Sequence, residues 1–188
     1  MKAAFDTPYK PRPGVEKVTI QTKVINLFGG PGIGKSRTAS SLYSLMKSNG
    51  FNVELVTEFA KDLTWEENWK ALSCQIFVSA TQYYRQFRLL SKVDYIITDS
   101  PLLLGAAYTK NDNYKYAIFN MFNEFDNINY FLTRDPSKYS TTGRKESLER
   151  AIQLDHEIES ILIDNSIICS KVKNSAETIF GDIQRRQK

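Results

Sequence analysis

Residues 24–36 read VINLFGGPGIGKS, and this stretch decides the fold. Its first part, residues 24–28, is an apolar run typical of a buried central strand, and a glycine-rich turn follows at once. Residues 35–48 then place apolar side chains at helical spacing, and Asn49-Gly50 supplies a helix stop. Strand, glycine turn and helix therefore follow one another in the order of a phosphate-binding loop.

The turn matches the pattern G-x-x-x-x-G-K-S over residues 29–36. Its glycines allow backbone conformations in which successive N–H groups point inward at phosphate oxygens. Lys35 then supplies a point charge for the β- and γ-phosphates, and Ser36 offers a hydroxyl to Mg²⁺. The alternative is a glycine-rich turn that only joins a strand to a helix. We expect ATP with Mg²⁺ to bind here, and the residues expected to contact the nucleotide are Gly29, Gly30, Pro31, Gly32, Ile33, Gly34, Lys35, Ser36 and Arg37.

The rest of the chain alternates between apolar runs and helical patterns. Further strands are predicted at residues 51–56, 93–98, 128–132 and 166–169. Helices are predicted at residues 60–90, with an interruption near 73, and at 114–125, 146–163 and 175–186. This alternation predicts an α/β fold, a five-stranded parallel sheet with helices on both faces. We expect residues 17–188 to form a single domain after an N-terminal arm, residues 1–16.

Composition bounds the functions that the chain can have. Its 188 residues are 41% hydrophobic, and 25 Lys and Arg against 21 Asp and Glu give a formal charge of +4, a mild excess that fits an anionic ligand. Cys74 and Cys169 lie in apolar stretches expected to be buried, and they make no disulfide framework or zinc site. His156, the only histidine, has acidic neighbours typical of a solvated helix face. With no membrane-spanning run, we expect a soluble cytoplasmic protein of unassigned oligomeric state.

Asp99 follows the apolar run 95–98, so its carboxylate is expected at the carboxyl end of a central strand, close to the magnesium ion. The alternative is a helix N-cap, because Asp-Ser-Pro is also good capping chemistry. Ser100 stands where motor ATPases of the AAA and helicase types carry a water-activating Glu, which disfavours a motor. A GTPase is also disfavoured, because no Asn-Lys-x-Asp motif for reading guanine is present.

A kinase also needs a carboxylate that accepts or orients the proton of the acceptor hydroxyl. Glu58 comes directly after the second predicted strand, whose end faces the same crevice, and is the candidate for this catalytic role. Asp62 is the second candidate for this role. The alternative for Glu58 is an ordinary surface glutamate.

A basic segment at residues 134–150 follows the fourth predicted strand and has the pattern of a lid that neutralises transferred phosphate while excluding water. Arg144, beside Gly143, is the candidate catalytic arginine of this segment. The alternative is a solvated loop that continues into a helix face.

These motifs together resemble a known family. The glycine loop, Thr57-Glu58-Phe59-Ala60-Lys61, Ile97-Thr98-Asp99-Ser100-Pro101 and Gly143-Arg144 resemble the small AAA_28-type P-loop kinase-like family that includes the ribosylnicotinamide kinase domain of NadR. The resemblance covers residues 23–163. It implies a parallel sheet of order 2-3-1-4-5 and ATP-dependent phosphorylation of a nucleoside-like hydroxyl. The compact layout is also similar to P-loop proteins of large phages.

The region between the second and third predicted strands roofs the acceptor pocket in kinases of this architecture. Trp65 or Tyr83 could stack on a base or pyridine ring there, and Gln82 and Arg85 could read polar edges or a phosphate. The alternative is that the aromatic residues only fill the core.

The leading hypothesis is a kinase of a nucleoside- or nucleotide-like small molecule. A kinase of a hydroxymethylated base within DNA is less favoured because the net charge is modest, and a nucleotide-binding regulatory protein or ATPase is the third hypothesis.

Overall fold

The computed structural model describes residues 22–135, 137 and 147–187, and within these residues five strands form one parallel sheet. The strands are β1 (Lys23–Phe28), β2 (Val53–Val56), β3 (Tyr95–Thr98), β4 (Asp126–Leu132) and β5 (Ser170–Val172). Their order is β2-β3-β1-β4-β5, and every neighbouring pair is parallel. The predicted fold class and strand order are therefore confirmed. The N-terminal arm, residues 1–16, lies outside the described residues.

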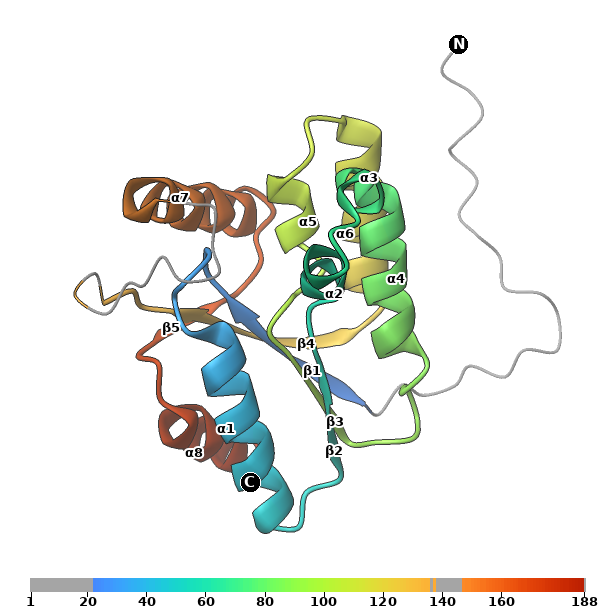
Figure 1. Ribbon diagram of the computed structural model, residues 1–188. Helices are drawn as coiled ribbons and strands as arrows, with labels where there is room; N and C mark the ends of the chain where they lie inside the picture. Colours follow the sequence, from blue (N-terminus) through green and yellow to red (C-terminus); the bar gives the residue numbers. More distant parts are fainter. Residues whose placement is uncertain (1–21, 136, 138–146, 188) are drawn as a thin grey trace, which may run out of the picture.

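Helices cover both faces of the sheet (Figure 1). The helices are α1 (Lys35–Ser48), α2 (Phe59–Trp65), α3 (Trp69–Ser73), α4 (Gln75–Phe87), α5 (Leu104–Ala107), α6 (Asp112–Asn123), α7 (Leu148–Asp164) and α8 (Ala176–Arg185). On one face α1 packs beside α8, and on the other α5 packs beside α6 and α7, with α4 next to α6. The long predicted helix at residues 60–90 is three helices, α2 to α4.

Strand β1 is the central strand of the sheet, with two strands on each side and helices on both faces. The apolar side chains of Val24, Ile25, Leu27 and Phe28 are all fully buried. This environment explains why the strand reads as a continuous apolar run rather than as an alternating pattern. The glycine-rich sequence that follows β1 is thus attached to a buried strand that is paired on both sides.

One polar residue interrupts this run. The Asn26 side chain is buried, and its Nδ2 donates to Oδ1 of Asn127 at 2.8 Å and to Oδ1 of Asn129 at 3.0 Å, both on β4. Asn26 lies opposite Asn129 in the ladder between β1 and β4. Because a buried polar group must find partners, these bonds favour the observed register of the two strands over a register shifted by one residue.

The fifth predicted strand was wrong in position, since β5 begins at Ser170 rather than at residue 166. The backbone of residues 166–167 is used to end helix α7. Ser166 has a φ of 56°, and the N–H groups of Ser166 and Ile167 donate back to the carbonyls of Ile163 and Leu162. The chain can pair with β4 only after this turn, and Ile168 is left exposed.

The cysteines were also placed wrongly by the sequence pattern. Cys74 is exposed because it lies at the junction where α3 ends and α4 begins, and Cys169 is half-buried.

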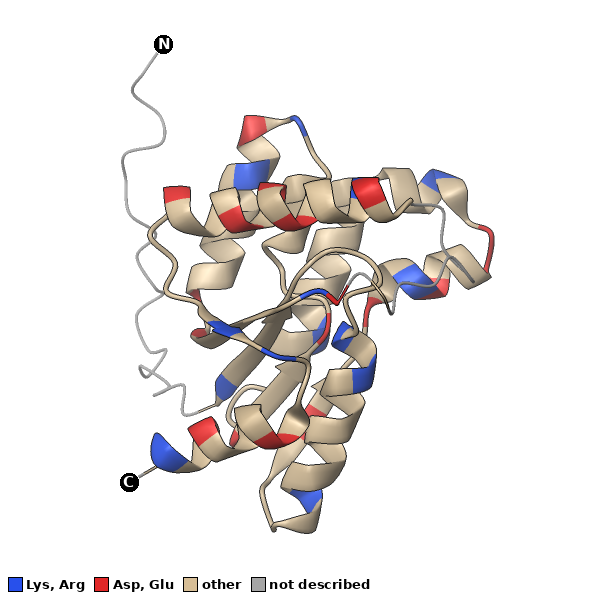
Figure 2. Cartoon of the chain, turned by 90° about the vertical axis from the view of Figure 1, so that its left-hand side faces the viewer, with Lys and Arg blue, Asp and Glu red and all other residues tan. Residues whose placement is uncertain are grey.

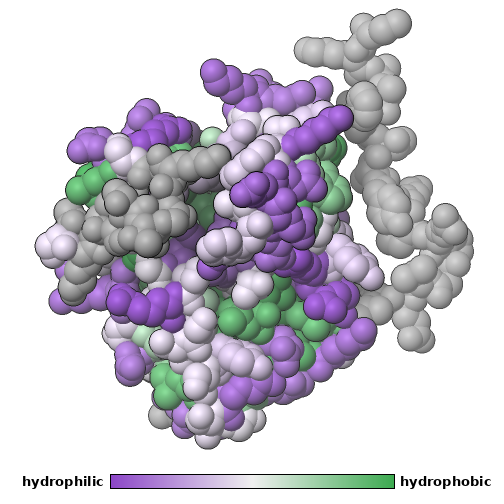
Figure 3. All heavy atoms as spheres, in the orientation of Figure 1, coloured by the Kyte–Doolittle hydropathy of each residue, from purple (hydrophilic) through white to green (hydrophobic). Residues whose placement is uncertain are grey.

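None of the described helices is long and apolar enough to cross a membrane. The face seen in Figure 3 is mainly hydrophilic, with a hydrophobic patch between α1 and the edge strand β2.

Candidate active site at the phosphate-binding loop

The loop of residues 29–34 connects β1 to the N-terminus of α1. Gly34 has a φ of 101°, which a residue with a side chain rarely adopts, and α1 begins at the next residue. The first N–H groups of a helix have no partner within the helix, and the helix dipole places partial positive charge there. The N-terminus of α1 therefore lies where the sequence motif predicts an anion-binding site.

Lys35 is the first residue of α1, and its side chain turns back over the loop. Its Nζ donates to the carbonyl oxygens of Gly29 at 2.7 Å and Gly30 at 3.1 Å. Burial lowers the pKa of the Lys35 ammonium from its usual value. Three carboxylates act in the opposite direction on this pKa, in decreasing order those of Glu58, Asp99 and Asp155. Acidic residues from three separate segments thus share the electrostatic environment of one ammonium group.

Asp99 follows β3, the strand beside β1. It is 4% exposed, and its Oδ1 has no hydrogen-bond partner among the described residues. The capping alternative is wrong, because the N-cap of α5 is Leu103, and the N–H of Ser100 is satisfied by Thr98 Oγ1 instead. A buried carboxylate oxygen with unused lone pairs beside a phosphate-binding loop is suited to a hard cation such as Mg²⁺.

Protein side chains alone do not complete a metal site here. No cluster of three or more His, Cys, Asp or Glu side chains with metal-binding geometry is found in the part of the chain that the structure describes. Mg²⁺ typically takes only one or two protein carboxylates and fills its shell with water and substrate phosphate oxygens. Asp99, with the exposed hydroxyl-bearing Ser36 in the first turn of α1, fits that kind of site.

Glu58 lies between β2 and α2, with its backbone extended at φ −66° and ψ 118°. It occupies the N-cap position of α2, yet its side chain makes no capping hydrogen bond. The side chain is half-buried and is the first of the carboxylates that raise the pKa of Lys35. Asp62, the reserve candidate, is paired instead with Arg85 of α4, at 2.6 Å between Oδ2 and Nη2.

Asp155 of α7 was not predicted from the sequence to lie at the loop, and its partner is Arg134, the first residue of the basic segment predicted at residues 134–150. Asp155 Oδ1 accepts from the backbone N–H of Gly30 at 2.5 Å, and its Oδ2 accepts from Arg134 Nε at 2.5 Å. The Arg134 side chain is only 8% exposed in this pair. Acidic residues recur along α7 (Figure 2), and no local pattern distinguishes Asp155 from the others.

The opposite side of the loop is held by Asn174, between β5 and α8, which the sequence analysis also missed. Its Nδ2 donates to the carbonyl oxygen of Ile33, and a Cβ at position 34 would lie only 3.0 Å from that nitrogen. Asn174 also lines a hollow of about 210 Å³ next to α1, together with Arg37, Thr38, Ser41, Ser175, Ala176 and Glu177. Arg37 is exposed there. Arg144, the predicted lid arginine, lies outside the described residues.

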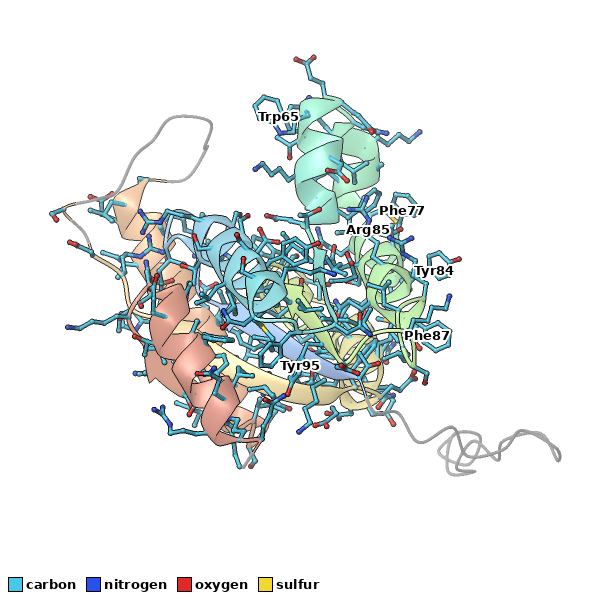
Figure 4. The ribbon with its side chains drawn as sticks, turned by 90° about the horizontal axis from the view of Figure 1, so that it is seen from below. Trp65, Phe77, Tyr84, Arg85, Phe87 and Tyr95 are labelled. Carbon is cyan, nitrogen blue, oxygen red and sulfur yellow. The ribbon has the colours of Figure 1, made fainter. Side chains whose placement is uncertain are left out.

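The four residues that could contact the acceptor lie in different surroundings. Trp65 is 78% exposed at the outer end of α2 (Figure 4). Tyr83 packs against Phe87 and Phe125, with ring centroids 5.5 Å apart in each pair. Gln82 and Arg85 both bind parts of the segment that follows β2. Tyr83, Gln82 and Arg85 therefore make contacts within the protein in this structure.

Comparison with known proteins agrees with this geometry. The model of the family AAA_28, described as an AAA domain, matches residues 24–178. The chain belongs to this family. No curated protein matches the sequence.

Solved structures with this fold include two nucleotide-metabolising kinases. A thymidylate kinase from Ehrlichia chaffeensis has a TM-score of 0.57 and 14% identity, over 89% of this chain and 99% of that one. A deoxyadenosine kinase from M. mycoides with bound dATP has a TM-score of 0.54 and 18% identity, over 86% and 98%. The same enzyme with products dCMP and dCDP bound scores 0.52 at 16% identity, over 87% and 98%. This AAA_28 protein therefore has the fold of those kinases over nearly its whole length.

The contact of α7 with the loop predicts that Gly30 cannot carry a side chain. A Cβ there would lie 2.8 Å from both the carbonyl oxygen of Ala151 and Oδ1 of Asp155, which forces the helix or the loop to move. We expect Gly30→Ala to lower the free energy of unfolding by about 1–3 kcal/mol, measured by urea denaturation.

Gly181→Ala is the matched control, because a Cβ at this position in α8 meets nothing within 4 Å. Alanine favours a helix, so this control is expected to be neutral or stabilising. Equal stability of the two variants would contradict the close packing of α7 on the loop.

Proposed function

We propose that this protein is an ATP-dependent kinase that transfers the γ-phosphoryl group to a hydroxyl of a nucleoside- or nucleotide-like small molecule. The observation that carries the proposal is the environment of Lys35. An ammonium on a phosphate-binding loop is flanked by Glu58 and Asp99, which follow the ends of two neighbouring strands. A cation for phosphate and two carboxylates with separate surroundings are the parts that phosphoryl transfer to a hydroxyl needs.

The loop binds and orients the polyphosphate of ATP in this proposal. Backbone N–H groups and the N-terminus of α1 hold the phosphate oxygens, and Lys35 moves its ammonium from the loop carbonyls to the β- and γ-phosphates. Because Gly30 and Ile33 are held by Asp155 and Asn174, the loop is organised before the nucleotide binds. This preorganisation reduces the entropy that must be lost when the phosphates are ordered.

Asp99 and Ser36 are the residues that would hold Mg²⁺. The ion, when bound, neutralises charge on the phosphate oxygens. Asp99 suits this role because it is buried and its Oδ1 has no partner among the described residues.

Glu58 orients the acceptor hydroxyl and takes its proton as the oxygen bonds to the γ-phosphorus, while the bond from that phosphorus to the β–γ bridging oxygen breaks and ADP leaves. Three observations support this role. The Glu58 side chain is half-buried, it makes no capping hydrogen bond to α2, and its charge raises the pKa of Lys35. The acceptor class is supported by the shared fold, since the structural neighbours are kinases of deoxyadenosine and thymidylate. We place the reaction in the cytoplasm, consistent with two free cysteines.

The function is tested by incubation with labelled ATP, Mg²⁺ and a panel of nucleosides, nucleoside monophosphates, nicotinamide riboside and hydroxymethylated DNA. We expect label in a small nucleoside-like product and none with Lys35→Ala, whose thermal unfolding should stay cooperative. Label that appears only in DNA would favour the other acceptor class, and label only in free phosphate would contradict a kinase.

Asp99→Asn is expected to act on the magnesium dependence. The substitution keeps the shape of the side chain but removes its charge, so the Mg²⁺ concentration for half-maximal rate should rise about tenfold or more. A magnesium titration of transfer rate for both proteins measures this change. An unchanged titration curve would exclude Asp99 as a magnesium-binding residue.

Glu58→Gln is expected to separate transfer from nucleotide binding. The loop that binds ATP is unaltered, so the dissociation constant of ATP should stay within about twofold, while transfer should fall by about 10²–10⁴-fold because a positioned base is lost. Calorimetric ATP titration and acceptor phosphorylation are measured on the same preparation. Parallel loss of binding and transfer would assign Glu58 to the phosphate side instead.

A further inference from the structure

Gln82 is a buried glutamine on α4 that bonds the backbone on both sides of Glu58. It is 4% exposed. Its Oε1 accepts from the N–H of Phe59 at 3.0 Å, and its Nε2 donates to the carbonyl oxygen of Thr57 at 3.3 Å. Both ends of the side-chain amide are therefore used, and the residue between the two contacts is the candidate base.

This pattern is that of a β-ladder made by a side chain. In a parallel pair, one residue donates to the carbonyl before its partner and accepts from the N–H after it. Gln82 makes these two bonds around Glu58. The paired part of β2 ends where Val56 lies opposite Thr98, and the chain of β3 then turns away through Pro101, which has no N–H. The glutamine amide thus continues, for one residue, the pairing that the sheet no longer supplies.

The same contact starts helix α2. Phe59 is the first residue of that helix, so its N–H has no partner within the helix. An N-cap side chain normally helps to satisfy such groups, but the Glu58 side chain makes no capping bond. Gln82 Oε1 accepts from the Phe59 N–H, so the first N–H of α2 is satisfied by a side chain of α4.

Neighbouring contacts hold α4 against this segment. Arg85, one turn after Gln82, lies over the Phe59 ring at 4.8 Å from its centroid and pairs with Asp62 of α2. Phe77 of α4 meets the same ring edge to face, at 5.4 Å between centroids. Phe77 and Arg85, both labelled in Figure 4, thus contact the same ring at the start of α2. The position of Gln82 relative to Glu58 is therefore determined by packing as well as by its own hydrogen bonds.

We propose that Gln82 is a positioning residue, which fixes the backbone of Glu58 so that its carboxylate meets the acceptor hydroxyl. This role rests on the proposed kinase function and on Glu58 as the base. Both ends of the Gln82 amide bond the protein backbone, so its proposed effect on the reaction is exerted through Glu58. A misplacement of about 1 Å can cost about 10²-fold in rate, which sets the scale of the expected effect.

The test compares Gln82→Met with Gln86→Met. Gln86 lies one turn further along α4 and is 1% exposed, and its Nε2 has no hydrogen-bond partner among the described residues. Gln86→Met therefore makes the same replacement at a buried position but does not remove the two bonds of Gln82 to the backbone around Glu58. The acceptor is whichever compound of the panel the unmodified protein phosphorylates fastest. We expect Gln82→Met to lower kcat by about 10–100-fold with the ATP dissociation constant within about twofold, and Gln86→Met to change neither.

A double variant separates positioning from general loss of structure. If Gln82 acts through Glu58, Gln82→Met should add less than about threefold to the loss already caused by Glu58→Gln. Multiplied losses in the double variant would overturn the positioning role, because Gln82 would then act independently of Glu58. Normal transfer by Gln82→Met would overturn it as well and leave the proposed function standing.

Amide hydrogen exchange tests the two bonds of Gln82 to the backbone around Glu58 without requiring that the protein be active. Exchange at the Phe59 N–H should be faster in Gln82→Met than in Gln86→Met, since only the first variant removes its acceptor. Equal exchange in the two variants would overturn the inference at its structural basis. Absence of transfer by the unmodified protein would overturn the kinase proposal and the positioning role together, and the Phe59 exchange rate then still shows whether the bridge exists.

Discussion

The Lys35 ammonium is the charge around which this site is arranged. A half-buried cation must be compensated, and the loop alone offers only the carbonyl oxygens of Gly29 and Gly30. The remaining compensation comes from carboxylates on segments that follow β2 and β3 and on α7. A parallel sheet delivers such groups because the carboxyl ends of its strands open at one edge. The proposed kinase chemistry uses the same carboxylates that compensate the charge of the half-buried Lys35.

The phosphate-binding loop depends on the C-terminal half of the chain as much as on its own glycines. Asp155 and Asn174 bond the loop from opposite sides, 125 and 141 residues away in sequence. The Asp155 carboxylate is itself compensated by Arg134, whose side chain is 8% exposed, so removal of either partner would leave a poorly solvated charge beside the loop. The loop conformation is therefore a property of the whole domain, although its motif spans eight residues.

What could be predicted from the sequence was local or periodic. The glycine motif and the spacing of residues 35–48 correctly predicted the loop and the bounds of α1, and the ends of apolar runs located Glu58 and Asp99. Asp155, Asn174 and the bridging role of Gln82 could not be predicted, because each depends on a partner at least 23 residues away and none breaks a local pattern. β5 was misplaced because the apolar residues 167–169 suggested a strand, whereas the N–H groups of Ser166 and Ile167 bond back to the end of α7 and pairing with β4 begins only at Ser170.

The central position of β1 has a consequence for the order of events during synthesis. β1 is the first strand of the described chain to leave the ribosome, but both of its partners come later, β3 from Tyr95 and β4 from Asp126. At about 5–20 residues per second, roughly a hundred residues take on the order of 5–20 s to add. For that time the nascent chain presents an unpaired apolar strand, a segment that chaperones bind. The glycine motif is thus translated early, while the loop with its Asn174 contact is among the last parts of the domain to assemble.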